Sequence, residues 1–345
     1  MAVKHVVRFE PVGIEIEVDE DQNILRAAAE QGITLMHGCK EGQCSSCKSF
    51  VLDGEDPELD KYSTFALPDS EKEEGYTLLC RAHVYEDVTI ELLNYDEEMI
   101  RSGKPIQEAV AEVVSNELVT HDMRHLVVKL VEPQDIEYWP GQYVDIAIPN
   151  TEETRSFSMA NTTSKDGGRL EFVIKVYPDG LFSNFLNTKV QVGDRLDLVG
   201  PFGVFTLRDR ESDIVFVGGG AGMAPILCLL RTLAERGSTR KVTYYYGART
   251  KRDLCFEDEL HSLFETLPNF RFVPALSMPD DDTWDGEVGL ITDVMKQHET
   301  DLAEADSYVC GPPPMVEAAI DMLSGLGASD KNIYYDKFTT TGEPT

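Results

Sequence analysis

The sequence is poor in basic residues. Lys and Arg number 31 against 62 Asp and Glu, which gives the 345-residue chain a formal net charge of −31. A surface this acidic repels phosphate backbones and anionic lipids, so the composition argues against a nucleic-acid or membrane partner. Hydrophobic residues make up 42% of the chain, which excludes a wholly disordered or fibrous protein.

Long apolar runs are missing as well. The first residues, MAVKHVVRFEPVG, lack the apolar core of a signal peptide. The longest uncharged run, residues 214–230, contains three consecutive glycines and a proline, so it would make a poor membrane helix. We therefore expect a cytoplasmic protein. Because the cytosol keeps thiols reduced, the seven cysteines need a role other than disulfides.

The sequence divides into three blocks that differ in their pattern of expected strands and helices. They predict a multidomain α+β and α/β protein with domains at 1–98, 105–207 and 210–345. The first has two strand-like runs and a helix capped by Asn23, and carries 23 acidic against 8 basic residues. The second has regular short strands, which are typical of a small β-barrel. The third alternates strands and helices, which predicts a parallel α/β sheet. The polar segment 97–104 is expected to be a linker.

Four cysteines of the first block follow the spacing C-x4-C-x2-C-x32-C, the plant-type ferredoxin pattern for a [2Fe–2S] cluster. Such clusters need thiolate ligands, and glycines in the loop let backbone N–H groups turn toward the sulfurs. A structural zinc site is the alternative, but zinc usually takes two close cysteine pairs. The block resembles a plant-type ferredoxin with a β-grasp fold over roughly residues 3–96. The predicted cluster ligands are Cys39, Cys44, Cys47 and Cys80.

The second block carries motifs in a fixed order: G-Q-Y at 141–143, R-S-F-S at 155–158, G-L-F-S at 180–183 and G-P-F-G at 200–203. Together they resemble the FAD-binding β-barrel of the ferredoxin–NADP reductase superfamily. The resemblance implies that Arg155 pairs with a flavin phosphate, Phe157 lies on the isoalloxazine ring and Ser158 reaches the flavin N5. Residues 180–183 would begin a helix that holds the diphosphate. The expected flavin-binding residues are Arg155, Ser156, Phe157, Ser158, Val173, Lys175, Gly180, Leu181, Phe182 and Ser183.

The third block begins with a buried strand and a glycine loop, G-G-G-A-G-M-A-P at 218–225. The spacing is not G-x-G-x-x-G, but it resembles the glycine motif of the same superfamily in a Rossmann-like NAD domain. The sequence C-G-P-P-P-M at 310–315 resembles the motif whose cysteine lies beside the reacting nicotinamide carbon. Phe338 matches a C-terminal aromatic that covers the flavin. The expected nicotinamide residues are Gly219, Gly220, Gly222, Pro225, Cys310, Gly311 and Pro312, with Ser158, Cys310 and Phe338 at the reacting atoms.

The domain order resembles that of the reductase components of soluble di-iron monooxygenases, with overall similarity highest to the propane and methane type. The resemblance implies electron transfer from NADH through FAD and the [2Fe–2S] cluster to a di-iron hydroxylase partner. Reductases of phenol hydroxylases or of aromatic ring-hydroxylating dioxygenases have the same modules and remain an alternative. A redox sensor or electron carrier without NADH turnover is the second alternative.

The choice between NADH and NADPH depends on the loop after the second strand of the third block. Arg249 in this loop could meet a 2′-phosphate. No cluster of Arg, Lys and Ser accompanies it, so we expect NADH.

Overall fold

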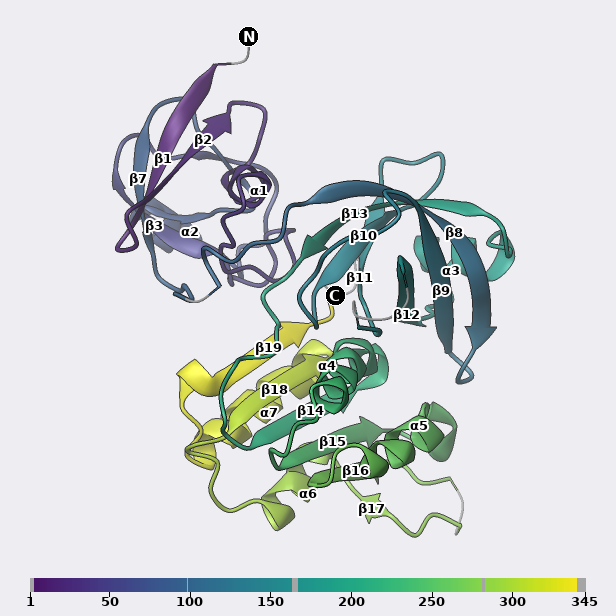
Figure 1. Ribbon diagram of the computed structural model, residues 1–345. Coiled ribbons are helices and arrows are strands. Elements are labelled where there is room, and N and C mark those ends of the chain that lie inside the picture. Colours follow the sequence, from purple (N-terminus) through teal and green to yellow (C-terminus); the bar gives the residue numbers. More distant parts are fainter. Residues whose placement is uncertain (1–2, 98, 163–166, 281–282, 340–345) are drawn as a thin grey trace. The chain divides into compact units, whose positions relative to one another are not determined.

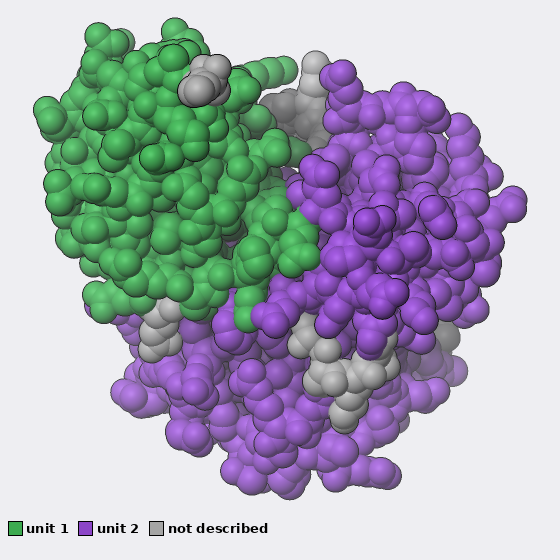
Figure 2. Space-filling model, turned by 45° about the horizontal axis from the view of Figure 1, so that its top comes forward, with its two compact units in different colours: residues 1–107, 201–204 green, residues 108–200, 205–345 purple. Residues whose placement is uncertain are grey.

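The structure is a computed structural model that describes residues 3–97, 99–162, 167–280 and 283–339. The chain forms two compact units (Figures 1 and 2): residues 1–107 with 201–204, and residues 108–200 with 205–345. Residues 98 and 340–345, where the first and third predicted domains end, lie outside the described residues. Among the described residues, no helix is both long and apolar enough to cross a bilayer.

The first unit is a five-stranded sheet with strand order β2-β1-β7-β3-β5. β1 and β2 form the predicted antiparallel hairpin, and β1 pairs in parallel with β7. The side chain of Asn23 accepts the Arg26 N–H, so the predicted cap of α1 is confirmed. The elements are β1 Lys4–Glu10, β2 Ile14–Asp19, α1 Ile24–Glu30, β3 Lys48–Asp53, β4 Glu58–Leu59, α2 Asp69–Glu73, β5 Tyr76–Leu78, β6 Ala82–His83 and β7 Val88–Leu92.

The segment after residue 98, expected to be an exposed linker, packs on the first unit. The side chains of Met99 and Ile100 are buried, and Ile100 belongs to the core of the five-stranded sheet. The Ile100 carbonyl accepts the Thr34 N–H at 3.0 Å. The structure differs from the expectation because a few apolar residues within a polar stretch are enough to reach the core.

Residues 201–204 belong to the first unit although the strand that leads into them starts in the second. The Nε2 of buried His37 accepts the Gly203 N–H at 3.1 Å, while its Nδ1 lies 2.7 Å from the Leu35 carbonyl. The Lys40 ammonium lies 3.5 Å from the centre of the Phe202 ring. The cysteine loop therefore holds the turn 201–204 by a hydrogen bond and a cation–π contact.

The second unit begins with a six-stranded antiparallel barrel of strand order β11-β10-β13-β8-β9-β12. A bridge between Met159 and Phe172 joins the two end strands and closes the barrel, as the sequence predicts. Alternate residues of the strands fill its interior. The elements are β8 Gln107–Leu118, β9 Met123–Glu132, β10 Tyr143–Ala147, β11 Thr154–Ser158, β12 Arg169–Lys175, α3 Leu181–Thr188 and β13 Arg195–Phe202.

The nucleotide lobe, residues 214–339 of the same unit, is a parallel sheet of strand order β17-β16-β15-β14-β18-β19. Ile214 and Phe216 face a core shared with α4 and α5, whereas Val215 and Val217 face a core shared with α6 and α7 (Figure 1). Helices on both faces confirm the predicted α/β class. The elements are β14 Ile214–Gly219, α4 Met223–Glu235, β15 Val242–Ala248, α5 Glu257–Ser262, β16 Phe270–Leu276, β17 Glu287–Val288, α6 Ile291–His298, β18 Asp306–Gly311, α7 Pro313–Gly325 and β19 Ile333–Lys337.

One predicted helix is shorter than its sequence pattern indicates. The pattern at 258–267 predicts a continuous helix, but α5 ends at Ser262 and a 3₁₀ turn follows over Leu263–Glu265. Pro268 disfavours helical backbone at Leu267, so the helical segment cannot continue beyond the 3₁₀ turn.

Truncating Ile100 should destabilise the first unit. We expect Ile100→Ala to lower the free energy of unfolding by about 2–4 kcal/mol, because a buried side chain is lost and a cavity remains. Leu93→Ala is the matched control, since Leu93 is 50% exposed and its truncation should cost less than about 1 kcal/mol. Urea unfolding of the full-length protein, followed by visible absorbance of the cluster, measures both. Equal effects would mean that the segment 99–107 does not contribute to the core.

Candidate functional site

The cysteine loop surrounds its sulfurs with backbone donors. The N–H groups of Glu41 and Gln43 donate to the Cys39 sulfur at 3.4 and 3.2 Å, and the Cys39 N–H donates to the Cys44 sulfur at 3.3 Å. Lys40 adopts a left-handed conformation, with φ of 57°, that turns the chain inward. Such donors stabilise negative charge on thiolates, which an iron–sulfur cluster requires.

The four cluster cysteines lie in two pairs. The thiols of Cys39 and Cys44 hydrogen-bond each other, which raises the pKa of Cys39 and lowers the pKa of Cys44 to about 5. The thiols of Cys47 and Cys80 also hydrogen-bond, which raises the pKa of Cys80. This arrangement provides two ligands for each of two metal ions.

The sulfur positions also bear on the zinc alternative. A single tetrahedral zinc, with bonds of about 2.3 Å, would bring all four sulfurs within about 3.8 Å of one another. Within the described part of the chain, no three cysteine sulfurs lie within 4.8 Å of each other. The residues present therefore fit a two-iron cluster better than a single zinc ion.

The R-S-F-S sequence forms β11 at the edge of the barrel sheet. Ser158 lies opposite Tyr143 of β10 and is buried. Phe157 packs on Phe182 with ring centroids 4.6 Å apart, so the two predicted flavin motifs meet. The guanidinium of Arg155 contacts the Glu153 carboxylate at 2.7 Å and donates to the Thr154 carbonyl at 2.6 Å.

The second flavin motif begins α3. Gly180 is the N-cap residue, and a Cβ there would lie 2.9 Å from the Ser183 hydroxyl oxygen. That hydroxyl accepts the Tyr177 N–H at 2.9 Å, so Ser183 closes the turn that precedes the helix. Of the remaining predicted residues, Val173 is buried in the core that β12 shares with the nucleotide lobe, and the Lys175 ammonium pairs with Asp122.

The glycine loop lies against the end of β18. β14 pairs with β18 so that Gly218 is opposite Cys310, and the loop then turns directly into α4. A Cβ at Gly222 would lie 2.1 Å from the Cys310 carbonyl oxygen, and one at Gly311 would lie 2.8 Å from the Gly219 carbonyl oxygen. The two predicted nicotinamide motifs are thus in backbone contact, which only glycine permits.

Cys310 itself is fully buried. Burial, followed by the charge of Asp336 on β19, raises the pKa of its thiol well above the usual value. A neutral thiol is a poor nucleophile, so the environment favours an orienting role over covalent chemistry. Phe338 follows β19, donates its N–H to the Gly311 carbonyl at 2.9 Å and packs against the core next to Cys310.

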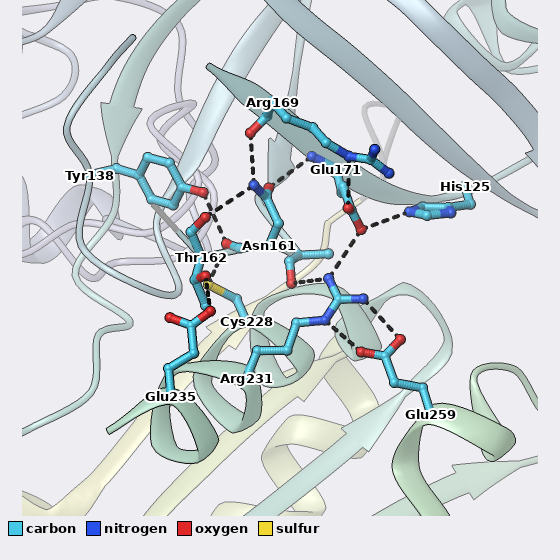
Figure 3. Close-up of polar contacts among 11 residues, drawn as sticks. His125, Tyr138, Asn161, Thr162, Arg169, Glu171, Cys228, Arg231, Glu235 and Glu259 are labelled. Atoms are coloured by element: carbon cyan, nitrogen blue, oxygen red, sulfur yellow. Dashed lines mark hydrogen bonds and ion pairs between the residues drawn. The ribbon is translucent and has the colours of Figure 1, made fainter. Parts of the chain in front are cut away.

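The sequence motifs do not include the polar contacts that join the barrel to the nucleotide lobe. Arg231 of α4 binds Glu171 of β12, and Cys228 of α4 donates to the Asn161 carbonyl (Figure 3). Arg231 and Glu171 are 60 residues apart in sequence. No local pattern could have found this pair, because neither residue lies in a motif.

Replacing one cluster ligand should remove iron and leave the flavin. We expect Cys39→Ser to lose most of its iron and retain its FAD, because the flavin motifs at 155–158 and 180–183 lie in the other unit. Iron analysis and the flavin absorbance spectrum measure the two contents. Cys255→Ala is the control, since Cys255 is buried in the core of the second unit and this variant should keep both iron and FAD. A full iron complement in Cys39→Ser would exclude Cys39 as a ligand.

A side chain at Gly222 should disturb the nicotinamide site. We expect Gly222→Ala to reduce NADH-dependent ferricyanide reduction about 10-fold or more at normal FAD content, because the new Cβ forces the loop away from Cys310. Gly237→Ala is the control. Gly237 follows α4 with a φ of +63°, and a Cβ at this residue would meet no atom within 4 Å, so only a small stability cost of about 1 kcal/mol is expected. Equal losses of turnover would contradict the role of the backbone contact.

The comparisons with known proteins agree with this geometry. Family models match residues 7–85 as a 2Fe-2S iron-sulfur cluster binding domain, 110–207 as an oxidoreductase FAD-binding domain and 216–321 as an oxidoreductase NAD-binding domain. The propane 2-monooxygenase reductase component of Mycolicibacterium smegmatis is 49% identical over 99% of both chains. A phenol 2-monooxygenase reductase component of Pseudomonas sp. (strain CF600) is 34% identical over 98% of this chain and 95% of its own.

Among solved structures, the cytochrome P450 reductase of Amycolatopsis superposes with a TM-score of 0.88 at 28% identity, covering 98% of this chain and all of its own. Sequence and structure thus agree over nearly the whole length, and the predicted cofactors, FAD, NAD and a [2Fe–2S] cluster, are confirmed at the level of domains. The chain belongs to the ferredoxin–NADP reductase superfamily, as an NADH-dependent reductase component that joins a plant-type [2Fe–2S] domain to FAD- and NAD-binding domains.

Proposed function

We propose that this protein is the reductase component of a propane-oxidising monooxygenase and delivers electrons to the di-iron hydroxylase of that system. One observation carries the proposal. Identity to a propane 2-monooxygenase reductase component is 49% over 99% of both chains, against 34% to a phenol 2-monooxygenase reductase component.

In this proposal the barrel holds FAD. Arg155 on β11 and the backbone N–H groups at the start of α3 bind the flavin phosphates. Ser158, buried opposite Tyr143, would offer its hydroxyl to the flavin N5. When bound, FAD supplies the chemistry that the chain lacks, because it takes two electrons from NADH and passes them on singly.

The nucleotide lobe holds NADH. Backbone N–H groups of the glycine loop lie at the start of α4 and receive the pyrophosphate, while the loop fixes the position of Cys310. The neutral Cys310 thiol would orient the nicotinamide ring, and Phe338, which packs against the core that includes Cys310, would cover the flavin. The reaction requires no general base from the protein, so the task of these residues is alignment.

The hydroxylase partner must be recognised by residues outside the flavin and NADH sites. A phenol 2-monooxygenase reductase component and a cytochrome P450 reductase each match this chain over nearly its whole length, so the architecture does not select the hydroxylase. The first block carries 23 acidic against 8 basic residues, and this block also holds the cluster from which electrons leave. An acidic domain that carries the cluster favours a partner with a basic docking face.

The test is reconstitution with purified hydroxylases. We expect NADH-driven substrate oxidation with the di-iron hydroxylase of a propane monooxygenase, and at least about 10-fold less with that of a phenol hydroxylase, which corresponds to a coupling difference of about 1.4 kcal/mol. Equal rates, or a preference for the phenol hydroxylase, would overturn the assignment.

A salt series in the same assay tests the docking surface. Electron delivery to the hydroxylase should slow as ionic strength rises, because salt screens exposed charges beyond about 10 Å at 0.1 M. Flavin reduction by NADH, measured at the same salt concentrations, corrects for effects on the first step. An association rate independent of salt would mean that the acidic residues serve only solubility.

A further inference from the structure

All three guanidinium nitrogens of Arg231 on α4 donate hydrogen bonds (Figure 3). Two of them bind within the nucleotide lobe and the third reaches the barrel. Its Nε and Nη2 donate to the two carboxylate oxygens of Glu259 on α5, at 2.6 and 2.9 Å. Its Nη1 donates across to the barrel, to Glu171 Oε2 at 3.1 Å. Only arginine offers this planar fork with a further donor free for a second partner.

The same Nη1 donates to the carbonyl of Ala160 at 3.0 Å. Ala160 follows Ser158 by two residues, and its own N–H donates to the Glu171 carbonyl at 2.7 Å. Arg231 therefore holds the chain just beyond Ser158 in two ways, directly at Ala160 and through the side chain of Glu171.

Asn161 extends the contact by one residue. Its carbonyl accepts the Cys228 thiol and the Tyr138 hydroxyl, both at 2.9 Å, and its Oδ1 accepts the Glu171 N–H at 2.9 Å. Cys228 precedes Arg231 by three residues on α4, so both side chains lie on one face of that helix. The segment 160–161 is thus fixed to α4 at two successive residues.

The Glu171 carboxylate stays charged in this site. Burial alone would raise its pKa, but the hydrogen bond from His125 and the charge of Arg231 outweigh burial and lower the pKa to about 2. His125 donates from β9 at 3.1 Å, and Arg169 contacts the other oxygen at 3.1 Å from the same strand as Glu171. Of these three donors, only Arg231 lies outside the barrel.

The helix that carries Arg231 also carries the glycine loop. α4 begins at Met223, immediately after Gly222, and Arg231 is eight residues further on, about 12 Å along the axis. One rigid helix therefore connects the loop that contacts Cys310 with the side chain that holds the residues after Ser158.

We propose that Arg231 is a positioning residue that aligns the nicotinamide bound at the glycine loop with the flavin bound at Ser158. The proposal rests on the roles proposed above for Ser158 and Cys310. It does not depend on the identity of the hydroxylase. A displacement of about 1 Å between reacting groups can reduce a rate by about 100-fold, so a contact of this kind acts on the two-electron step and leaves binding of either cofactor intact.

The test compares Arg231→Met with Arg169→Met. Both variants remove one cation from Glu171, but Arg169 lies on β12 itself and does not reach α4. Flavin reduction is followed anaerobically in a single turnover at saturating NADH, without any hydroxylase. We expect Arg231→Met to slow flavin reduction about 10-fold or more at normal FAD content, Arg169→Met to stay within about 2-fold, and Arg231→Lys to recover part of the rate.

A second readout uses the flavin-free protein. Amide hydrogen exchange at Ala160, Asn161 and Glu171 should accelerate in Arg231→Met and remain at the wild-type rate in Arg169→Met. A wild-type rate of flavin reduction in a folded Arg231→Met protein, or equal slowing in both variants, would overturn the proposal.

If Arg231→Met does not fold, the double variant Arg231→Met with Glu171→Met replaces it. This variant removes the bridge without leaving the buried Glu171 carboxylate deprived of Arg231, and replacing both partners of a buried ion pair by apolar residues is often neutral for stability. NADH should reduce the flavin of this double variant at least about 10-fold more slowly than the flavin of the wild-type protein. A wild-type rate would overturn the proposal. Because no partner enters the assay, a wrong assignment of the hydroxylase would leave these rates unchanged.

Discussion

The nucleotide lobe depends on a contact between two backbones. The carbonyl of Cys310 occupies the position that any side chain at residue 222 would need, and the Gly219 carbonyl does the same for residue 311. The parallel pairing of β14 with β18 brings these loops to the same end of the sheet. Both halves of the nicotinamide site are therefore positioned by main chain, and the conformation of one loop fixes the other.

The barrel and the nucleotide lobe are joined by buried charged side chains rather than by backbone contact. Glu171 is buried with three cationic or hydrogen-bonding neighbours, and Arg231 spans from it to Glu259. Buried ion pairs contribute little net stability, because desolvation offsets most of the attraction. The hydrogen bonds of such a pair nevertheless require a specific position and orientation of both side chains. A buried ion pair is therefore better suited to aligning two lobes than to stabilising their association.

Local chemistry explains which features the sequence reveals. The Asn23 cap, the glycine loop and the cysteine spacing are each encoded within a few residues, and the structure forms the first two as predicted and brings the four cysteines together in pairs. Long-range pairing leaves no such local signal. Burial of Ile100 and the contact of Arg231 with Glu171 arise only after distant segments meet, and the polar composition around Ile100 pointed to a linker.

The two units have different functional requirements. Within the second unit, transfer between nicotinamide and flavin requires direct contact of the reacting rings. Backbone contact fixes the two loops, and in our proposal the bridge at Arg231 aligns them with the flavin. Single electrons leave from the cluster of the first unit to a separate protein, and this step requires encounter rather than permanent alignment. An excess of exposed carboxylates serves encounter, because long-range attraction raises association rates more than it raises affinity. If the hydroxylase docks on the first unit as we propose, changes on the surface of that unit would alter the choice of partner, while the chemistry constrains the internal geometry of the second unit.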